Sequence, residues 1–169
     1  SYNAEQSFTI NELAGITIPL FKKLDCEIIF EPGRYLTANG GILVTGTDTI
    51  VSNNYIYSSY YYGICTFIAA RCVVDGNYII SSLSRGISIE TSNNSMICNN
   101  FISASVSTGV DISSSDFCKT CNNMIQSSEA NSIYVDTCFS VAVENNYLYN
   151  TVDNAIVLTD SPYSSINGN

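Results

Sequence analysis

Three acidic residues, Glu90, Asp111 and Asp136, have a spacing that could support chemistry. Each follows the last by about one period of a 23-residue repeat, so all three are expected on successive turns of one outward face. Turns of a parallel structure lie roughly 4.8 Å apart, and a two-residue offset adds about 6.6 Å, which predicts Cα separations of about 8–10 Å. Glycoside hydrolysis needs paired carboxylates at roughly 5–9.5 Å, one to protonate the leaving oxygen and one to attack or to activate water. The three acids are therefore the candidate catalytic residues.

The same face carries three candidate substrate-binding residues, Tyr134, Ser88 and Ser113. Tyr134 lies between the acids and could stack on a sugar ring. Arg85 and Lys119 are the nearest cations for an acidic sugar, although the register does not place them firmly. A second interpretation stays open, because fifteen acidic residues on a small domain put some on every face and three together also suit a solvated surface.

The repeat is most visible in one column of asparagines. Stacked at one position, interior amides can bond to backbone groups left over at a bend and to the amides above and below them. A repeat of this length indicates a solenoid, in which like residues stack along an axis. The expected structural ladder is Asn54, Asn77, Asn100, Asn123, Asn146 and Asn169.

Each period reads as three short strands. The first begins after a small residue and alternates apolar with polar positions, as in Gly86-Ile87 followed by Ile89. Alternation with a period of two is typical of strands, and no segment after about residue 40 keeps a helical period. The predicted fold is all-β, a right-handed single-stranded parallel β-helix of about 23 residues per coil. The first coil is expected to lack one residue in the turn near Gly46.

Two further columns are expected from the same register. Aromatic or large apolar residues follow the asparagines and should point outward as a stripe. Small polar residues should form a second ladder at a corner. The stripe comprises Tyr55, Tyr78, Phe101, Met124 and Tyr147, and the corner comprises Ser58/Ser59, Ser81/Ser82, Ala104/Ser105 and Ser127/Ser128.

The chain divides into two parts by sequence. Residues 1–25 are expected to form an N-terminal cap segment, possibly helical, with Asn11 as N-cap and Lys22-Lys23 near the C-terminal end. Residues 26–169 are expected to form the β-helix. Because the last repeat stops on the asparagine column without a capping unit, we expect a fragment of a longer chain or an end covered by another segment or subunit.

Composition excludes several classes of function. The chain has 15 acidic and 6 basic residues and a net charge of −9, which argues against nucleic-acid binding. No apolar run is long enough to span a bilayer. Histidine is absent, which excludes histidine bases and histidine-ligated zinc within this chain. Abundant Ser, Asn and Tyr with little charge suit a flat surface that meets sugars.

The seven cysteines indicate no metal site and no cofactor. Cys118 and Cys121 form a lone CxxC pair, and zinc needs four ligands. Cys72 and Cys118 share an interior column two coils apart, beyond disulfide reach. Cys98 and Cys121 lie in adjacent coils, where the spacing permits a bridge. We expect the cysteines to be small packing residues, which suits assembly in a reducing cytoplasm.

The pattern resembles the right-handed β-helix superfamily of pectate lyases, polygalacturonases and phage tailspikes over about residues 24–169. The resemblance is carried by the Gly-Ile starts, by Asn53-Asn54 and its equivalents, and by Phe30-Glu31-Pro32-Gly33-Arg34-Tyr35. The catalytic motifs of the histidine-containing enzymes and of the calcium-dependent lyases have no match. The resemblance therefore implies a fold, and tailspikes, whose carboxylate pairs vary in position, are the nearest fit by elimination.

The sequence thus predicts a polysaccharide-recognising β-helix of a viral tailspike or fibre, a homotrimer on the virion assembled in the host cytoplasm. It could also cleave its polysaccharide as an endo-glycosidase through the carboxylates. One alternative is a structural or binding module without chemistry. Another is a secreted polysaccharide lyase.

Overall fold

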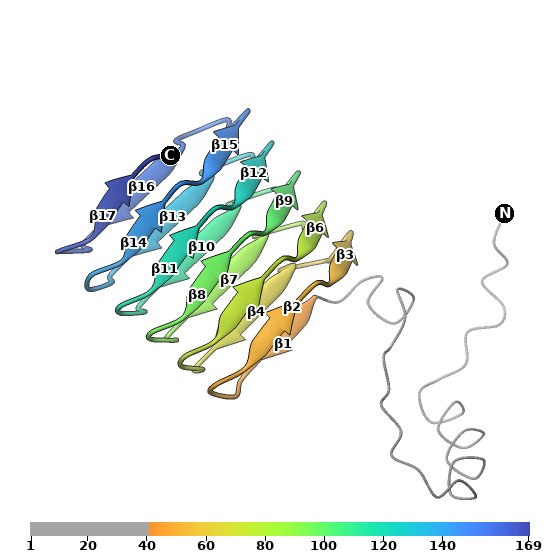
Figure 1. The fold of residues 1–169 in the computed structure, drawn as a ribbon. Helices are drawn as coiled ribbons and strands as arrows, with labels where there is room; N and C mark the ends of the chain where they lie inside the picture. Colours follow the sequence, from red (N-terminus) through yellow and green to blue (C-terminus); the bar gives the residue numbers. More distant parts are fainter. Residues whose placement is uncertain (1–40) are drawn as a thin grey trace, which may run out of the picture. The chain divides into compact units, whose positions relative to one another are not determined.

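The structure is a computed structural model that describes residues 41–169. All regular structure in this part of the chain is β: seventeen strands of three or four residues, without a helix. The predicted cap segment 1–25, and the start of the predicted β-helix at residues 26–40, lie outside the described residues. Successive strands belong in turn to three sheets, so that the chain winds through all three in each complete coil (Figure 1).

Each sheet is parallel and has its strands in the order of the coils. Sheet A contains β1 (Ile42–Val44), β4 (Ile64–Phe67), β7 (Ile87–Glu90), β10 (Val110–Ser113), β13 (Ile133–Asp136) and β16 (Ile156–Thr159). Sheet B contains β2 (Ile50–Ser52), β5 (Val73–Asp75), β8 (Met96–Cys98), β11 (Lys119–Cys121), β14 (Ala142–Glu144) and β17 (Ser165–Asn167). Sheet C contains β3 (Tyr55–Tyr57), β6 (Tyr78–Ile80), β9 (Phe101–Ser103), β12 (Met124–Gln126) and β15 (Tyr147–Tyr149).

The strand register confirms the 23-residue coil. Residues one period apart are paired, as in Ile89 with Ile112 in sheet A. In the first coil Ile42 pairs with Ile64, one residue short of the period that Ile50 and Val73 keep. The missing residue therefore lies in the turn that contains Gly46, as expected from the sequence.

Alternating strand residues fill the inside of the coil with aliphatic side chains. Ile89, Ile112 and Val135 stack in one such column, all fully buried. Burying a side chain of this size contributes about 1.5–3 kcal/mol, so a few stacked columns supply most of the driving force for the fold. The first strand of each coil is preceded by a small residue for steric reasons. A Cβ on Gly86 would lie 2.4 Å from Ile102 Cγ2 and 2.6 Å from the Gly109 carbonyl oxygen.

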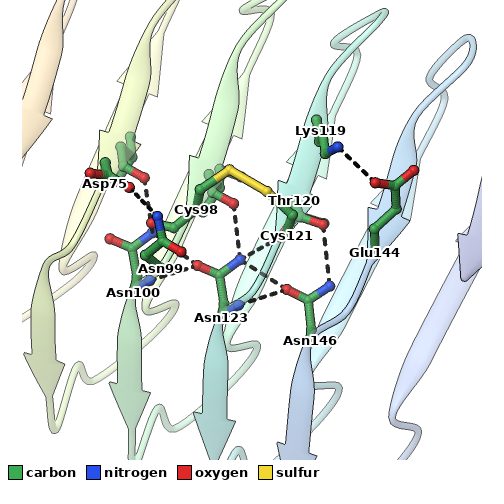
Figure 2. Close-up of a disulfide and its surroundings, with 12 residues drawn as sticks. Asp75, Cys98, Asn99, Asn100, Lys119, Thr120, Cys121, Asn123, Glu144 and Asn146 are labelled. Atoms are coloured by element: carbon green, nitrogen blue, oxygen red, sulfur yellow. Dashed lines mark hydrogen bonds and ion pairs between the residues drawn. A yellow bond between two sulfur atoms is a disulfide. The ribbon is translucent and has the colours of Figure 1, made fainter. Parts of the chain in front are cut away.

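The asparagine ladder is formed as predicted (Figure 2). The Oδ1 atom of Asn123 accepts the backbone N–H of Asn100 at 2.9 Å and its side-chain Nδ2 at 3.0 Å. The Nδ2 of Asn100 also donates to the carbonyl oxygens of Val74 and Cys98, both at 2.9 Å. The same pattern runs from Asn54 to Asn169. Each buried amide is therefore satisfied by the coils on either side of it.

The residue before each ladder position has a left-handed backbone. The φ angle is 57° at Asn53 and Asn99, and the equivalent in the second coil is Gly76 with φ 64°. Asparagine and glycine tolerate this conformation better than other residues. The repeated Asn-Asn dipeptide thus combines a residue that permits the bend with a residue that bonds across it.

The outward stripe on sheet C is present. The Tyr55 and Tyr78 rings stack with centroids 5.2 Å apart, and the Tyr78 and Phe101 rings stack at 4.4 Å. At the next corner the Ser59 hydroxyl donates to Ser82 at 3.0 Å. The predicted serine ladder is confirmed at that step only, because the Ser105 and Ser128 hydroxyls have no hydrogen-bond partner.

Cys98 and Cys121 form a disulfide between β8 and β11, with Cα atoms 4.8 Å apart (Figure 2). The prediction that the cysteines are unpaired packing residues is therefore wrong for this pair. The two side chains face each other across directly paired strands, where the 23-residue offset brings like positions together. The other described cysteines fit the prediction, since they are free and buried: Cys65, Cys72, Cys118 and Cys138.

Candidate active site on sheet A

The predicted catalytic acids share the outer surface of sheet A. Glu90 ends β7, Asp111 lies within β10, and Asp136 ends β13, so they come from three successive coils. The register places Asp111 in the outward column with Ser88 and Tyr134. Glu90 and Asp136 occupy the other outward column, on either side of Ser113. This is the arrangement expected from the sequence.

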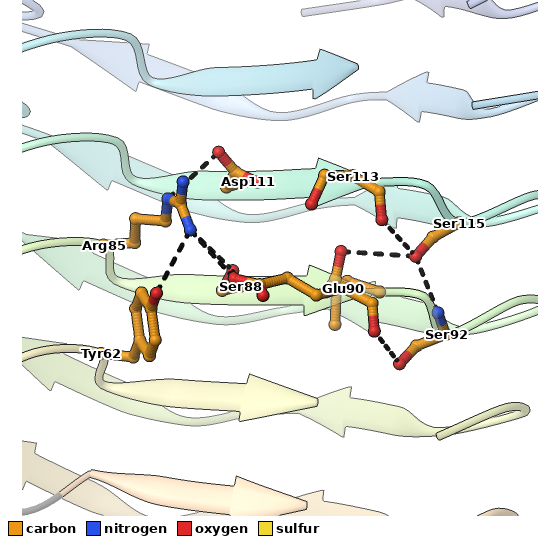
Figure 3. A network of polar contacts seen from close by, with 9 residues as sticks. Tyr62, Arg85, Ser88, Glu90, Ser92, Asp111, Ser113 and Ser115 are labelled. Carbon is orange, nitrogen blue, oxygen red and sulfur yellow. Dashed lines mark hydrogen bonds and ion pairs between the residues drawn. The ribbon is translucent and has the colours of Figure 1, made fainter. Parts of the chain in front are cut away.

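Arg85 joins two of these acids (Figure 3). Its Nη1 lies 2.9 Å from Glu90 Oε1, and its Nε lies 3.2 Å from Asp111 Oδ2. Arg85 precedes β7, and its place in the turn lets the side chain reach along the sheet across two coils. Because one planar guanidinium contacts both groups, the carboxyls of Glu90 and Asp111 share a single cation.

Asp111 is the acid of the site with the most unusual environment, because its carboxyl is buried. It is only 3% exposed, although it is on the outward side of the strand. Burial raises its pKa to about 6; Arg85 opposes the shift, whereas the nearby Glu90 and Asp136 charges add to it. Its Oδ1 atom has no hydrogen-bond partner. The raised pKa keeps a fraction of this carboxyl protonated near neutral pH, and the protonated form is the one that a general acid uses.

The three predicted substrate-binding residues differ from one another in how exposed they are. Ser88 is fully buried and donates its hydroxyl to Glu90 Oε1 at 2.8 Å, so it orients that acid and does not lie where a substrate could contact it. Ser113 and Tyr134 are partly exposed beside Asp111 and stay candidates for contact.

Tyr62 completes one side of the site and was not among the predicted residues. The Arg85 guanidinium carbon lies 5.6 Å from the centre of the Tyr62 ring, and Arg85 Nη1 lies 3.4 Å from the phenol oxygen. Tyr62 is one period before Arg85, so the register alone could have revealed this stack. Its ring limits the directions in which the guanidinium can move.

Asp136 differs from the other two acids in having no ion pair among the described residues, and no hydrogen bond to its carboxylate is seen there. It is partly exposed at the end of β13. Asp136 therefore offers a partly exposed carboxyl on the strand beside the buried Asp111, and acid–base catalysis uses two carboxyls in different environments.

The cations of residues 41–169 are all paired, although acidic residues outnumber them. Lys119 lies on sheet B and pairs with Glu144 at 2.7 Å, away from the acids of sheet A, and Arg71 pairs with Asp48. All three cations of this segment thus contact carboxylates. The segment holds no cluster of acidic or cysteine side chains arranged to bind a metal ion. Nor does it contain a helix with the length and apolarity needed to cross a membrane.

Comparison with known proteins agrees with the architecture. The sequence model of the family described as "Right handed beta helix region" matches residues 25–169. The periplasmic alginate epimerase AlgG is similar in structure, with a TM-score of 0.59 and 13% identity over 74% of this chain and 38% of its own. The catalytic unit of an alpha-1,3-glucanase from Streptomyces thermodiastaticus has a TM-score of 0.63 and 18% identity over 83% of this chain and 30% of its own.

These similarities concern the fold. The chain spans about a third of the length of the two solved structures, and the identities are too low to transfer a catalytic residue. A search of curated proteins found no significant match. The fold is nevertheless one that two enzymes acting on polysaccharides share.

Proposed function

Because this chain belongs to the right-handed β-helix family, we propose that the outer surface of sheet A binds a polysaccharide and hydrolyses it through Asp111 and Asp136. A parallel β-helix offers a long, straight face on which a polymer can lie. The observation that carries the proposal is the pairing of a buried carboxyl of pKa about 6 with a solvated carboxylate on the neighbouring strand.

In this proposal Asp111 is the general acid. It transfers its proton to the glycosidic oxygen as the bond from that oxygen to the anomeric carbon breaks. Asp136 takes a proton from the water that forms the new bond to the anomeric carbon. The products are a free hydroxyl and a hemiacetal, so one water is consumed for each bond cleaved.

Arg85 and Glu90 have supporting roles. Arg85 covers Asp111, so the substrate reaches this acid only if the guanidinium moves away from it. Glu90 lies 2.9 Å from Arg85 in the structure and can retain the guanidinium when it moves away from Asp111. In this proposal Glu90 is a positioning residue, whereas the sequence placed it among the candidate reacting acids.

The proposal is tested by incubating the protein with alpha-1,3-glucan, alginate and bacterial surface polysaccharides and measuring new reducing ends. Asp111→Asn and Asp136→Asn should each lower cleavage by about a hundredfold or more. Asp153→Asn, which changes an exposed turn acid bonded to Asn154, is the matched control and should leave cleavage unchanged. Unchanged cleavage in Asp111→Asn would remove this residue from the mechanism.

Binding without cleavage is the second candidate function. It is favoured by the burial of Asp111 under Arg85, which also suits an ion-pair network that only stiffens the surface. Polysaccharide that binds intact and stays at full length in the assay would establish the non-catalytic module.

The setting of the domain is proposed as a viral tailspike or fibre, with three chains assembled side by side on the virion. The aromatic surface of sheet C supports such assembly, because its strands carry no charged residue and contact there brings no like charges directly together. The Cys98–Cys121 bridge favours the alternative of a secreted protein, since disulfides persist in oxidising compartments. Sedimentation of the full-length protein and peptide mapping of material from its natural source discriminate between the two.

A further inference from the structure

Three exposed aromatic rings gather where the chain turns from sheet A to sheet B. They are Phe117, Phe139 and Tyr163, from three successive turns that follow β10, β13 and β16. The Phe117 and Phe139 ring centres are 5.5 Å apart, and those of Phe139 and Tyr163 are 4.9 Å apart. The turns lie directly after the strand ends that carry Ser113 and Asp136. We refer to this cluster as the aromatic corner.

The backbone of the aromatic corner is held firmly. The Phe117 N–H donates to the Phe139 carbonyl oxygen at 2.8 Å, and the Phe139 N–H donates to Asp116 Oδ1 at 2.8 Å. These bonds connect neighbouring coils, so the rings project from a rigid base. A rigid base lowers the entropy cost of binding a ligand to the rings.

Phe117 and Tyr163 have a backbone conformation that is unfavourable for a bulky residue. Phe117 has φ 55° and Tyr163 has φ 59°, in the column that Asn94 and Ser140 occupy in other coils. A bulky residue in the left-handed region is strained, whereas asparagine tolerates it well. Packing compensates little, because Phe117 is 56% exposed and Tyr163 is 80% exposed. Ile68 combines positive φ with exposure in the same way, so the feature that distinguishes Phe117 and Tyr163 is their contact with Phe139.

Ring orientation sets the aromatic corner apart from the stripe on sheet C. In the stripe, Tyr78 and Phe101 stack with planes 9° apart, so each ring covers a face of the next. In the aromatic corner the planes are inclined by 67° between Phe117 and Phe139 and by 50° between Phe139 and Tyr163. Inclined rings leave faces open, and the face is where the C–H groups of a sugar ring can pack against π electrons.

The size of the aromatic corner suits a small ligand better than a protein. With Phe139 at 41% exposure, the three rings offer about 250–450 Å² of accessible surface. A stable protein interface buries roughly 800 Å² on each partner. A polyanion is also disfavoured, because Asp116 and Asp160 are the nearby charges and every cation of residues 41–169 is paired.

We propose that the aromatic corner is a stacking subsite for an uncharged sugar unit of the polysaccharide bound on sheet A. This inference rests on the proposed function and specifies its substrate class as neutral. A chain lying across the strand ends would place one sugar on the rings while another lies over Asp111 and Asp136.

The test uses Phe117→Asn and Tyr163→Asn, with Ile68→Asn as the matched control. All three replace an exposed apolar side chain at positive φ by a residue that relaxes the backbone, but Ile68 lies outside the aromatic corner. Each variant should unfold at the same or a higher temperature than the parent. Affinity for oligosaccharides of alpha-1,3-glucan and of other neutral glycans, measured by calorimetry, should fall about tenfold in the first two and stay unchanged in Ile68→Asn.

The outcomes separate this inference from the proposed function. Neutral glycan that binds the parent and both corner variants equally would overturn the subsite and leave sheet A as the binding surface. Tighter binding of alginate than of every neutral glycan would overturn the neutral substrate class. If no glycan binds the parent, the proposed function and the subsite both fail. A lower unfolding temperature of Phe117→Asn would show that the ring is structural, which also contradicts the proposal.

Discussion

Arg85 contacts Asp111 from the turn one coil before it, Nε to Oδ2 at 3.2 Å, and thereby places a cation over a buried carboxyl. The contact connects the electrostatics of the site with the stability of the fold. Asp111 still keeps a raised pKa, so the desolvation of its carboxylate outweighs the attraction of the guanidinium. The balance leads to two predictions about Asp111 itself.

The first prediction concerns pH and stability. The pKa of Asp111 is about 6 in the folded chain against 3.8 for the ordinary group, so the folded state binds the proton more tightly. Its contribution to stability is therefore present below pH 4 and is lost as the pH rises to 6, on the order of 3 kcal/mol in all. Asp111→Asn, which resembles the protonated form, should be more stable than the parent at pH 7.5 and similar at pH 4. Urea unfolding of both proteins at pH 4 and at pH 7.5 measures this difference. If the parent became more stable relative to Asp111→Asn as the pH rises from 4 to 7.5, the prediction would be wrong.

The second prediction concerns Arg85. Removing its charge in Arg85→Met should raise the pKa of Asp111 further above 6, because the guanidinium is the main influence that lowers it. The carboxyl carbon of Asp111, followed by NMR during a pH titration, reports the change directly. Arg71→Met is the control, since its pair with Asp48 lies on the exposed surface and should leave the Asp111 titration unchanged. A lower pKa in Arg85→Met would disprove this account of the site.

The third prediction concerns the asparagine ladder. Asn100→Ala should destabilise the chain by about 3 kcal/mol, because it removes the hydrogen bonds that this buried amide makes with Asn77, Val74 and Cys98. Asn54→Ala, at the less buried first rung, should cost about 1 kcal/mol. Chemical denaturation compares the two, and equal losses would mean that the ladder adds little beyond ordinary surface hydrogen bonds.

The fourth prediction concerns the disulfide between β8 and β11. Closing a loop with a sequence separation of 23 should stabilise the chain by about 3 kcal/mol. The double variant Cys98→Ser/Cys121→Ser should therefore unfold at a lower temperature and no longer respond to reductant. Peptide mapping of the oxidised parent should show Cys98 linked to Cys121. Recovery of both as free thiols under oxidising conditions would refute the bridge.

The repeat made most of the fold predictable. Because like residues recur at one spacing, pairing, register and the direction of side chains in later coils follow from a single assignment, and even the shortened turn near Gly46 was predictable. Cys98 and Cys121 show the limit of this reasoning. Their spacing permitted a bridge, but the same spacing also suits two stacked thiols, and only side-chain orientation decides between them.

The sequence predicted where the residues of the site lie on the β-helix, but it did not predict the surroundings of their side chains. The sequence by itself determined that Glu90, Asp111 and Asp136 come to one face, because side-chain alternation and a constant coil length are local properties of the chain. Only the tertiary structure decided that Asp111 is buried, that Ser88 faces Glu90 and that Arg85 lies between the acids. Burial and the reach of a long side chain depend on what neighbouring coils place around a group, and desolvation, which sets the pKa, is a property of those surroundings.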